Sequence, residues 1–179
     1  MRPLIAALLV LPLLAACSTP RVGDYAGREP ALELERFFDG YLTAHGVVKD
    51  RAGRVTRHFN ADIRAYWEGE TGTLEEDFVF DDGEKTRRVW TLTRTGEGTY
   101  TGSAGDVIGE APVRVAGNSL FMEYVLRVPY GEGTIDLVVD DRMYLVHPDV
   151  LLNESTLSKF GVTVGGLLLV IERRPGQGS

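Results

Sequence analysis

Four polar residues stand where the alternation of apolar and polar residues predicts a side chain on an apolar face. They are Arg57, Glu76, Arg88 and Tyr124. Burial of a charge is costly unless an opposite charge or hydrogen bonds compensate it. One interpretation is structural, with Glu76 in an internal ion pair to either arginine, or with the arginines lining an open end. The other is functional, because a surplus arginine and the Tyr124 hydroxyl could hold an anionic group such as a fatty carboxylate.

Two tryptophans also stand on predicted apolar faces, where each would bury a large area. The candidate ligand site therefore comprises Arg57, Trp67, Glu76, Arg88, Trp90 and Tyr124. A cavity lined by the tryptophans and the tyrosine would favour ligand binding, whereas an interior filled with side chains would favour an interaction module. An isolated buried acid with a raised pKa, either Glu76 or Asp106, would favour an enzyme that transfers a proton.

Cys17 is the one cysteine of the 179-residue chain, and it follows a short apolar run. The run extends from Leu4 to Leu14, follows Arg2, and is separated from the cysteine by two alanines. This order is that of a secretory signal cleaved before a cysteine, and the apolar core is too short to span a bilayer permanently. We therefore predict that residues 1–16 are a signal peptide and that Cys17 becomes a lipidated N-terminus.

The residue after Cys17 is Ser18, whereas an aspartate there would favour retention in the inner membrane of a Gram-negative cell. We expect the chain in the outer membrane, anchored through its acyl groups, with the domain facing the periplasm. Lipidation also uses the only thiol of the chain. The domain must then be stable without a disulfide, even in an oxidising compartment.

Other patterns that indicate chemistry are scarce. His45, His58 and His147 are too scattered to predict a metal site, and we expect no cofactor. The sequence contains no nucleophile elbow, phosphate loop or dinucleotide fingerprint. Adjacent acids such as Asp140 and Asp141 point to opposite faces of a strand, so they cannot act as a carboxylate pair. We therefore expect no catalytic residues.

The chain has 26 acidic and 19 basic residues, a net charge of −7, and no basic run offsets the acids. Phosphate groups repel an acidic surface, so nucleic acid is not an expected partner. Membrane attachment must then come from the lipid anchor, and no protein partner can be identified.

Short β-like runs separated by glycine-containing turns occupy most of the chain after residue 40. The clearest predicted strand, 55–67, alternates between apolar and polar residues. Further strands are predicted at 73–80, 86–94, 99–103, 113–116, 119–128, 134–140, 143–146, 150–157 and 162–172. Before them, Leu32, Leu34, Phe37 and Phe38 form an apolar cluster, which predicts either a helical turn or an entering strand that plugs one end of the fold.

Consecutive short strands without a long helix predict an all-β fold, a single closed antiparallel up-and-down barrel of about 8–10 strands, because closure removes exposed strand edges. Outward charges such as Asp62 and Arg64 disfavour an outer-membrane barrel. The predicted organisation is a signal peptide at 1–16, a lipidated tether at 17–30, the barrel domain at 31–174 and a flexible tail at 175–179.

Several short blocks of the sequence resemble a family of Gram-negative lipoproteins catalogued as domain of unknown function 3833. The blocks follow in order at 37–40, 50–55, 72–78, 82–84, 88–90, 106–111, 140–145 and 159–162. The resemblance covers nearly all of the predicted domain and implies a lipocalin-like lipoprotein of undetermined activity. It also directs the ligand hypothesis toward lipids.

The leading hypothesis is a membrane-anchored β-barrel that binds a lipophilic ligand, either a fatty acid or a lipid fragment, without catalysis. One alternative is a non-catalytic interaction module of an envelope assembly. Another is an enzyme of lipid modification.

Replacing Cys17 with serine is expected to block processing, because the thiol is the group that carries the lipid. Cells fed labelled palmitate should therefore label the wild-type protein and leave the Cys17→Ser variant unlabelled, as read by gel fluorography. Equal labelling of both proteins would contradict the assignment.

Overall fold

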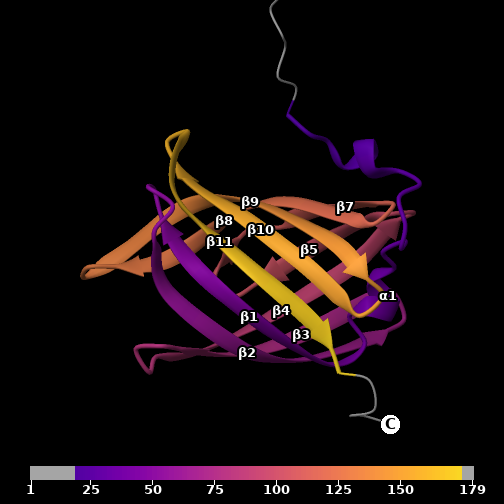
Figure 1. Cartoon of the computed structure of the whole chain (residues 1–179), viewed down its shortest axis with the longest axis horizontal. Helices are drawn as coiled ribbons and strands as arrows, with labels where there is room; N and C mark the ends of the chain where they lie inside the picture. Colours follow the sequence, from indigo (N-terminus) through magenta and orange to yellow (C-terminus); the bar gives the residue numbers. More distant parts are fainter. Residues whose placement is uncertain (1–18, 175–179) are drawn as a thin grey trace, which may run out of the picture.

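The computed structural model describes residues 19–174, which form an antiparallel sheet preceded by two short helices (Figure 1). The helices are a 3₁₀ helix, η1 (Val22–Tyr25), and α1 (Leu34–Phe37). The strands are β1 (Gly40–Asp50), β2 (Val55–Glu68), β3 (Thr71–Phe80), β4 (Lys85–Gly96), β5 (Thr99–Ala104), β6 (Val107–Ile108), β7 (Ala111–Ala116), β8 (Ser119–Tyr130), β9 (Gly133–His147), β10 (Val150–Lys159) and β11 (Val162–Arg173). Within this part of the chain, neither helix is long and apolar enough to cross a membrane.

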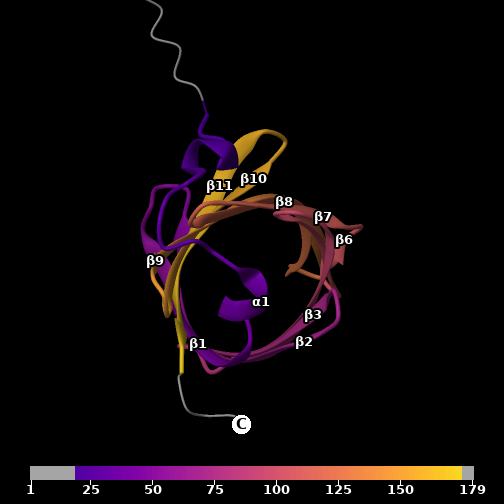
Figure 2. The same ribbon diagram turned by 90° about the vertical axis from the view of Figure 1, so that its right-hand side faces the viewer.

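The strands close into a ring. Each strand from β1 to β4 pairs with the next, β5 pairs with β7, and the order continues through β8 to β11. β11 then pairs with β1, which completes an up-and-down barrel of ten strands. β6 lies outside this ring and pairs with β8. The predicted closed barrel is confirmed, and Figure 2 shows the ring from one end.

Alternation along β2 sends one set of side chains into the barrel and the other to the outside. Phe59, Ala61, Ile63 and Ala65 are buried, as the apolar pattern predicts, whereas Asp62 between them is exposed. The strand is 14 residues long, which suits a tilted barrel strand.

Three strands differ from the prediction, and one of them is the two-residue β6, which the predicted strands do not include. β1 was not predicted, because Gly46 interrupts its apolar pattern. A Cβ at Gly46 would lie 2.5 Å from the Phe59 ring, so the missing side chain makes room for this inward aromatic. The predicted strands 134–140 and 143–146 form a single strand, β9, which continues through the charged residues between them.

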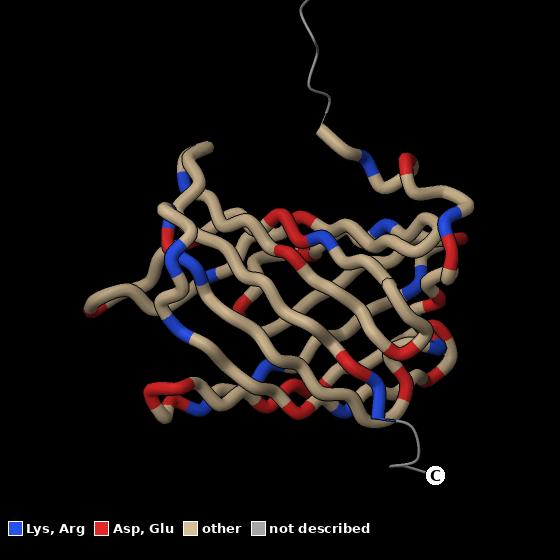
Figure 3. Tube along the Cα trace, viewed as in Figure 1, with Lys and Arg blue, Asp and Glu red and all other residues tan. Residues whose placement is uncertain are grey.

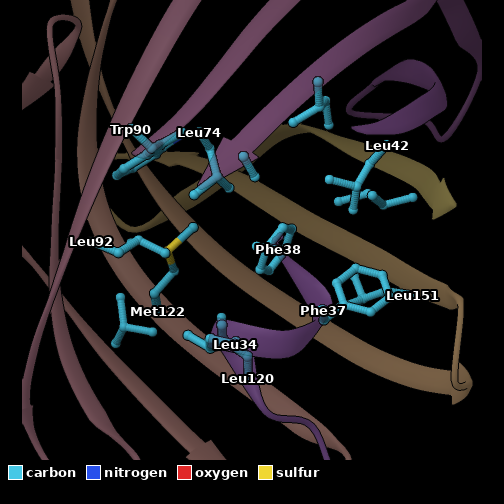
Figure 4. Packing of buried hydrophobic residues seen from close by; sticks show 14 of the residues in the cluster. Leu34, Phe37, Phe38, Leu42, Leu74, Trp90, Leu92, Leu120, Met122 and Leu151 are labelled. Carbon is cyan, nitrogen blue, oxygen red and sulfur yellow. The ribbon is translucent and has the colours of Figure 1, made fainter. Parts of the chain in front are cut away.

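The plug, residues 32–38, closes one end of the barrel with a single turn of helix. Leu34, Phe37 and Phe38 are at most 3% exposed. Figures 2 and 4 show α1 inside the ring, with its side chains beside Leu120 and Leu151. Of the two alternatives for this apolar cluster, the structure shows the helical turn, with Phe38 extending the plug beyond it.

Polar contacts fix the plug to the surrounding strands. The indole Nε1 of Trp67 donates a hydrogen bond of 2.9 Å to the carbonyl of Phe38. The hydroxyl of Tyr100 donates to the carboxylate of Glu35, also over 2.9 Å. These contacts come from β2 and β5, so strands distant in sequence hold the same segment.

Residues 19–30, predicted as part of the tether, lie outside the barrel and include η1. Tyr25 packs on the outer wall, with its ring centroid 5.5 Å from that of Phe121 and 5.4 Å from that of Tyr144. Gly117 adopts a positive φ of 54° in the turn after β7, and a Cβ there would clash with the backbone of Tyr25. The segment therefore follows the barrel wall before the plug enters the interior.

The other end of the barrel, at the left of Figure 1, is formed by four hairpin turns. They connect β1 to β2, β3 to β4, β8 to β9 and β10 to β11. Figure 3 shows acidic residues gathered at the β3–β4 turn, with both signs of charge interspersed along the strands. We call this the open end, because within residues 19–174 no helix lies inside the ring there.

The wall has a seam between β4 and β6. Lys85 to Val89 pair only with β3 among the described strands, and β5 joins β4 from Trp90 onward. Asp106, in the turn before β6, bridges this seam. Its carbonyl accepts a hydrogen bond of 2.8 Å from the backbone of Arg127 in β8, and its carboxylate contacts a β4 side chain.

Truncating the plug should destabilise the barrel strongly. Phe38→Ala is expected to lower the free energy of unfolding by about 3–5 kcal/mol, because it removes a buried ring and leaves a cavity. Urea unfolding followed by circular dichroism measures this loss. Phe160, which is 91% exposed, provides the matched control. Phe160→Ala should change stability by less than about 0.5 kcal/mol, and equal losses for both variants would contradict the role of the plug.

Candidate functional site in the barrel interior

The central cavity lies inside the barrel and has a volume of about 140 Å³. Its walls are mainly apolar side chains from strands all around the ring. Those toward the open end include Phe59, Phe78, Leu126, Leu157 and Leu167. A cavity of this kind, apolar with a few polar groups, is typical of small-molecule sites.

A smaller cavity of about 50 Å³ lies beside the plug, against Phe38. Five of its lining residues, Glu76, Trp90, Met122, Met143 and Ile171, also line the central cavity. Methionine side chains are flexible and adapt to irregular spaces. Movement of the two methionines would therefore join the two cavities into one elongated site.

Arg88 is the one basic residue that lines the central cavity within the described chain. Its guanidinium is bound to the carboxylate of Asp106, with Nε 3.0 Å and Nη2 2.5 Å from Oδ2. Both side chains are partly exposed, at 26% and 37%. The charge of Arg88 is thus already paired across the seam.

Glu76 faces the same cavity from β3, directly across the ladder from Arg88. No residue of the described chain donates a hydrogen bond to its carboxylate or forms a salt bridge with it. Burial raises the pKa of Glu76 to about 7; the positive charge of Arg88 opposes the shift, while Asp141 and Asp106 reinforce it. Near neutral pH, this carboxyl is therefore close to its midpoint of ionisation.

Asp141 is a second acid in the cavity wall and is only 5% exposed. Its Oδ1 accepts hydrogen bonds from Asn153 and, over 2.7 Å, from the hydroxyl of Ser155. Burial raises the pKa of Asp141 even though these hydrogen bonds favour the charged form. Its Oδ2 has no donor among the described residues.

Tyr124 completes the polar side of the cavity from β8. It is 9% exposed, and its ring packs edge-on against Trp90, with the centroids 5.3 Å apart. Burial raises the pKa of its hydroxyl, which therefore stays protonated. The hydroxyl has no hydrogen-bond partner within residues 19–174, so it is able to donate to or accept from a bound molecule.

The structure brings four of the six predicted ligand-site residues together around the central cavity: Glu76, Arg88, Trp90 and Tyr124. Trp67 lies at the plug instead, where it binds the carbonyl of Phe38. Trp67 is therefore separate from the four residues that line the cavity.

Arg57 also lies away from the cavity, at the open end, because acids of the β3–β4 turn hold its guanidinium there. It lies 2.8 Å from both Asp82 and Glu84 and 3.9 Å from the centre of the Phe80 ring. The structure thus places Arg57 at the open end, which was one of the structural alternatives. The expected ion pair with Glu76 does not form, because both arginines have other acidic partners.

Sequence reasoning missed Asn153 and Ser155 and did not assign Asp141 to the site. Alternation along the strand could have identified Asp141, because it falls on the same inward face as Val139 and Leu145. Its neighbour Asp140 points outward and pairs with Arg142, as predicted for adjacent acids on a strand. Cys17 lies outside the described residues, and no group of three metal-binding side chains occurs in the part described.

The model of the family described as "Protein of unknown function (DUF3833)" matches residues 11–173. No curated protein matches the chain. Among solved structures, the S-type phycobiliprotein lyase CPES from Guillardia theta is similar, with a TM-score of 0.58 and 14% identity over 88% of this chain and 99% of the lyase. Rv2717c from M. tuberculosis is also similar, with a TM-score of 0.56 and 16% identity over 82% of this chain and 99% of that protein. At these identities, the similarity supports the fold alone.

The pKa of Glu76 leads to a prediction on stability. The unfolded chain ionises a glutamate near pH 4.3, whereas the folded chain does so near 7, so stability falls as the pH rises between these values, by up to about 3 kcal/mol. Glu76→Gln removes this loss. Urea unfolding gives the free energy of unfolding of both proteins at each pH. Between about pH 4 and about pH 8, the difference between them should shift by about 2–3 kcal/mol in favour of the variant.

The neighbouring Glu75 provides the control for this measurement, because it points outward and lies 3.2 Å from Arg87. The difference between wild type and Glu75→Gln should vary little across the same pH range. A pH profile that is the same for the two glutamine variants would show that Glu76 ionises normally.

Proposed function

The chain belongs to the DUF3833 family, and we propose that its barrel binds a small lipophilic molecule at the surface of a bacterial membrane. The central cavity carries this proposal. It combines apolar walls with polar groups that have no hydrogen-bond partner within residues 19–174, namely the Glu76 carboxylate and the Tyr124 hydroxyl. A bound molecule that hydrogen-bonds to such a group inside an apolar cavity is stabilised by that contact.

The size of the cavity limits the ligand. An apolar cavity of about 150 Å³ holds a molecule the size of benzene. The central cavity, at about 140 Å³, therefore accepts one ring or a short chain segment as it stands. Movement of Met122 and Met143 would extend the site toward the plug and admit a longer acyl chain, such as part of a fatty acid or lipid fragment.

The anchor is part of the same proposal. The sequence pattern before Cys17 supports a lipidated N-terminus, which would hold the barrel beside the bilayer of the outer membrane. A lipophilic ligand partitions into that bilayer. A binding barrel tethered there would meet its ligand at a high local concentration.

The two competing hypotheses fit the interior less well. An interaction module would have its barrel filled by side chains, whereas this barrel retains a cavity. The raised pKa of Glu76 is compatible with proton transfer, but apolar walls and polar groups without partners require only a bound ligand to account for them. Binding is therefore the function that the geometry supports best.

The two tryptophans allow binding to be tested in the same protein. Trp90 lines the cavity and Trp67 lies at the plug, so Trp67→Phe leaves a reporter at the site and Trp90→Phe leaves one away from it. Titration with 1-octanol, a neutral amphiphile, should change the fluorescence of the Trp67→Phe variant with a Kd below about 1 mM, while the Trp90→Phe variant responds little. Absence of a saturable signal in both variants, with no heat of binding by calorimetry, would contradict the proposal.

A further inference from the structure

The polar groups inside the barrel define what kind of molecule they can hold. We propose that the central cavity binds an amphiphile with a cationic head, such as a primary ammonium, held by the carboxylates of Glu76 and Asp141 and by the hydroxyl of Tyr124. This inference rests on the proposed function and specifies the ligand class. It replaces the fatty carboxylate suggested by the sequence with a ligand of opposite charge.

The first argument is the balance of charge. The charged and titratable groups around Glu76 are Arg88 from β4, Asp106 from the turn before β6, Tyr124 from β8 and Asp141 from β9. Within residues 19–174, Arg88 is the single cation of this set, and two of its nitrogens already bind Asp106. Two carboxyls therefore remain without a positive partner, so a cation is attracted and a carboxylate is repelled.

The second argument is hydrogen bonding. Both donors to Asp141, Asn153 and Ser155, bind the same oxygen, Oδ1. Oδ2 of Asp141 and both oxygens of Glu76 are left as acceptors without a donor in the described chain. An ammonium group has three donors and no acceptor, so it can satisfy such a set, whereas a carboxylate ligand has no hydrogen to offer.

The third argument is the surrounding surface. Phe59, Phe78, Leu126 and Leu157 line the cavity toward the open end, and the plug closes the opposite end. An amphiphile that enters from the open end would thus place its head at the acids and its chain among these side chains. The aromatic pair of Trp90 and Tyr124 also lies beside the acids, and aromatic faces attract cations.

The charge of the head group determines the sign of the pH dependence. The Glu76 carboxyl becomes negative as the pH rises through about 7, while an alkylammonium remains positive. Its affinity should therefore increase with pH over this range. A carboxylate ligand would show the opposite trend, because ionisation of Glu76 adds repulsion, and a neutral alcohol should bind almost independently of pH.

Calorimetric titration with octylammonium, 1-octanol and octanoate provides the test, since the three probes share a chain and differ in charge. At about pH 8, octylammonium should bind about 10- to 100-fold more tightly than 1-octanol, as expected for a charge-assisted hydrogen bond, and octanoate more weakly than either. At about pH 5.5, the advantage of octylammonium over 1-octanol should shrink to a few-fold.

Matched variants identify the residue. Glu76→Gln should lower the affinity for octylammonium about 10- to 100-fold at about pH 8 and leave that for 1-octanol within a few-fold. Glu75→Gln makes the same chemical change on the outer face, where Glu75 contacts Arg87, and should leave all three affinities unchanged. Asp141→Asn should reduce octylammonium binding in the same direction as Glu76→Gln.

The outcomes separate the two proposals. If none of the three probes binds, the proposed function itself is wrong. If 1-octanol binds but octanoate binds more tightly than octylammonium at about pH 8, the barrel is a lipophile binder. The inference of a cationic head is then overturned, and Arg88 binds an anionic head instead. An octylammonium affinity equal in wild type and Glu76→Gln would also overturn it.

Discussion

Closure of the ring by pairing of β1 with β11 is the constraint on which the rest of this structure depends. Each strand of a barrel presents alternate side chains to one shared interior, so residues from β3, β4, β8, β9 and β10 meet there although they are distant in sequence. Closure also separates that interior from bulk solvent. On an open sheet, the carboxyls of Glu76 and Asp141 would be hydrated. Inside the barrel their pKa values are raised, and their oxygens need hydrogen-bond donors.

Much of the fold follows from patterns that the sequence shows directly. The alternation in β2 and the regular turns predict strands and their facing, and the cluster of Leu34, Phe37 and Phe38 predicts a plug. The strand β1 could not be predicted, because its Gly46 is explained by the ring of Phe59 and the side chain of Leu169 on the two neighbouring strands. Such a requirement belongs to the packed structure and leaves no local periodic signal.

The inward-facing residues of the candidate site could be predicted from the sequence, but their ion pairs could not. Alternation correctly placed Glu76, Arg88, Trp90 and Tyr124 toward the interior. It could not show that Arg88 binds Asp106, because that contact crosses from β4 to a turn after β5 and depends on where the ladder ends. This single contact changes the chemistry of the cavity, since it pairs the only positive charge that the described residues offer an anionic ligand there.

Neighbouring strands of the barrel wall are not joined equally strongly, because of the seam beside β4. Elsewhere, separating two neighbouring strands requires the loss of a series of backbone hydrogen bonds. Between β4 and β6, the described chain places the ion pair of Arg88 with Asp106 in the position that such a ladder would occupy. Local opening of a protein follows its least protected elements, so we expect this line to separate before the strand pairs that are joined by long ladders. Since Arg88 also borders the cavity, separation there exposes the interior from the side while the plug stays in place.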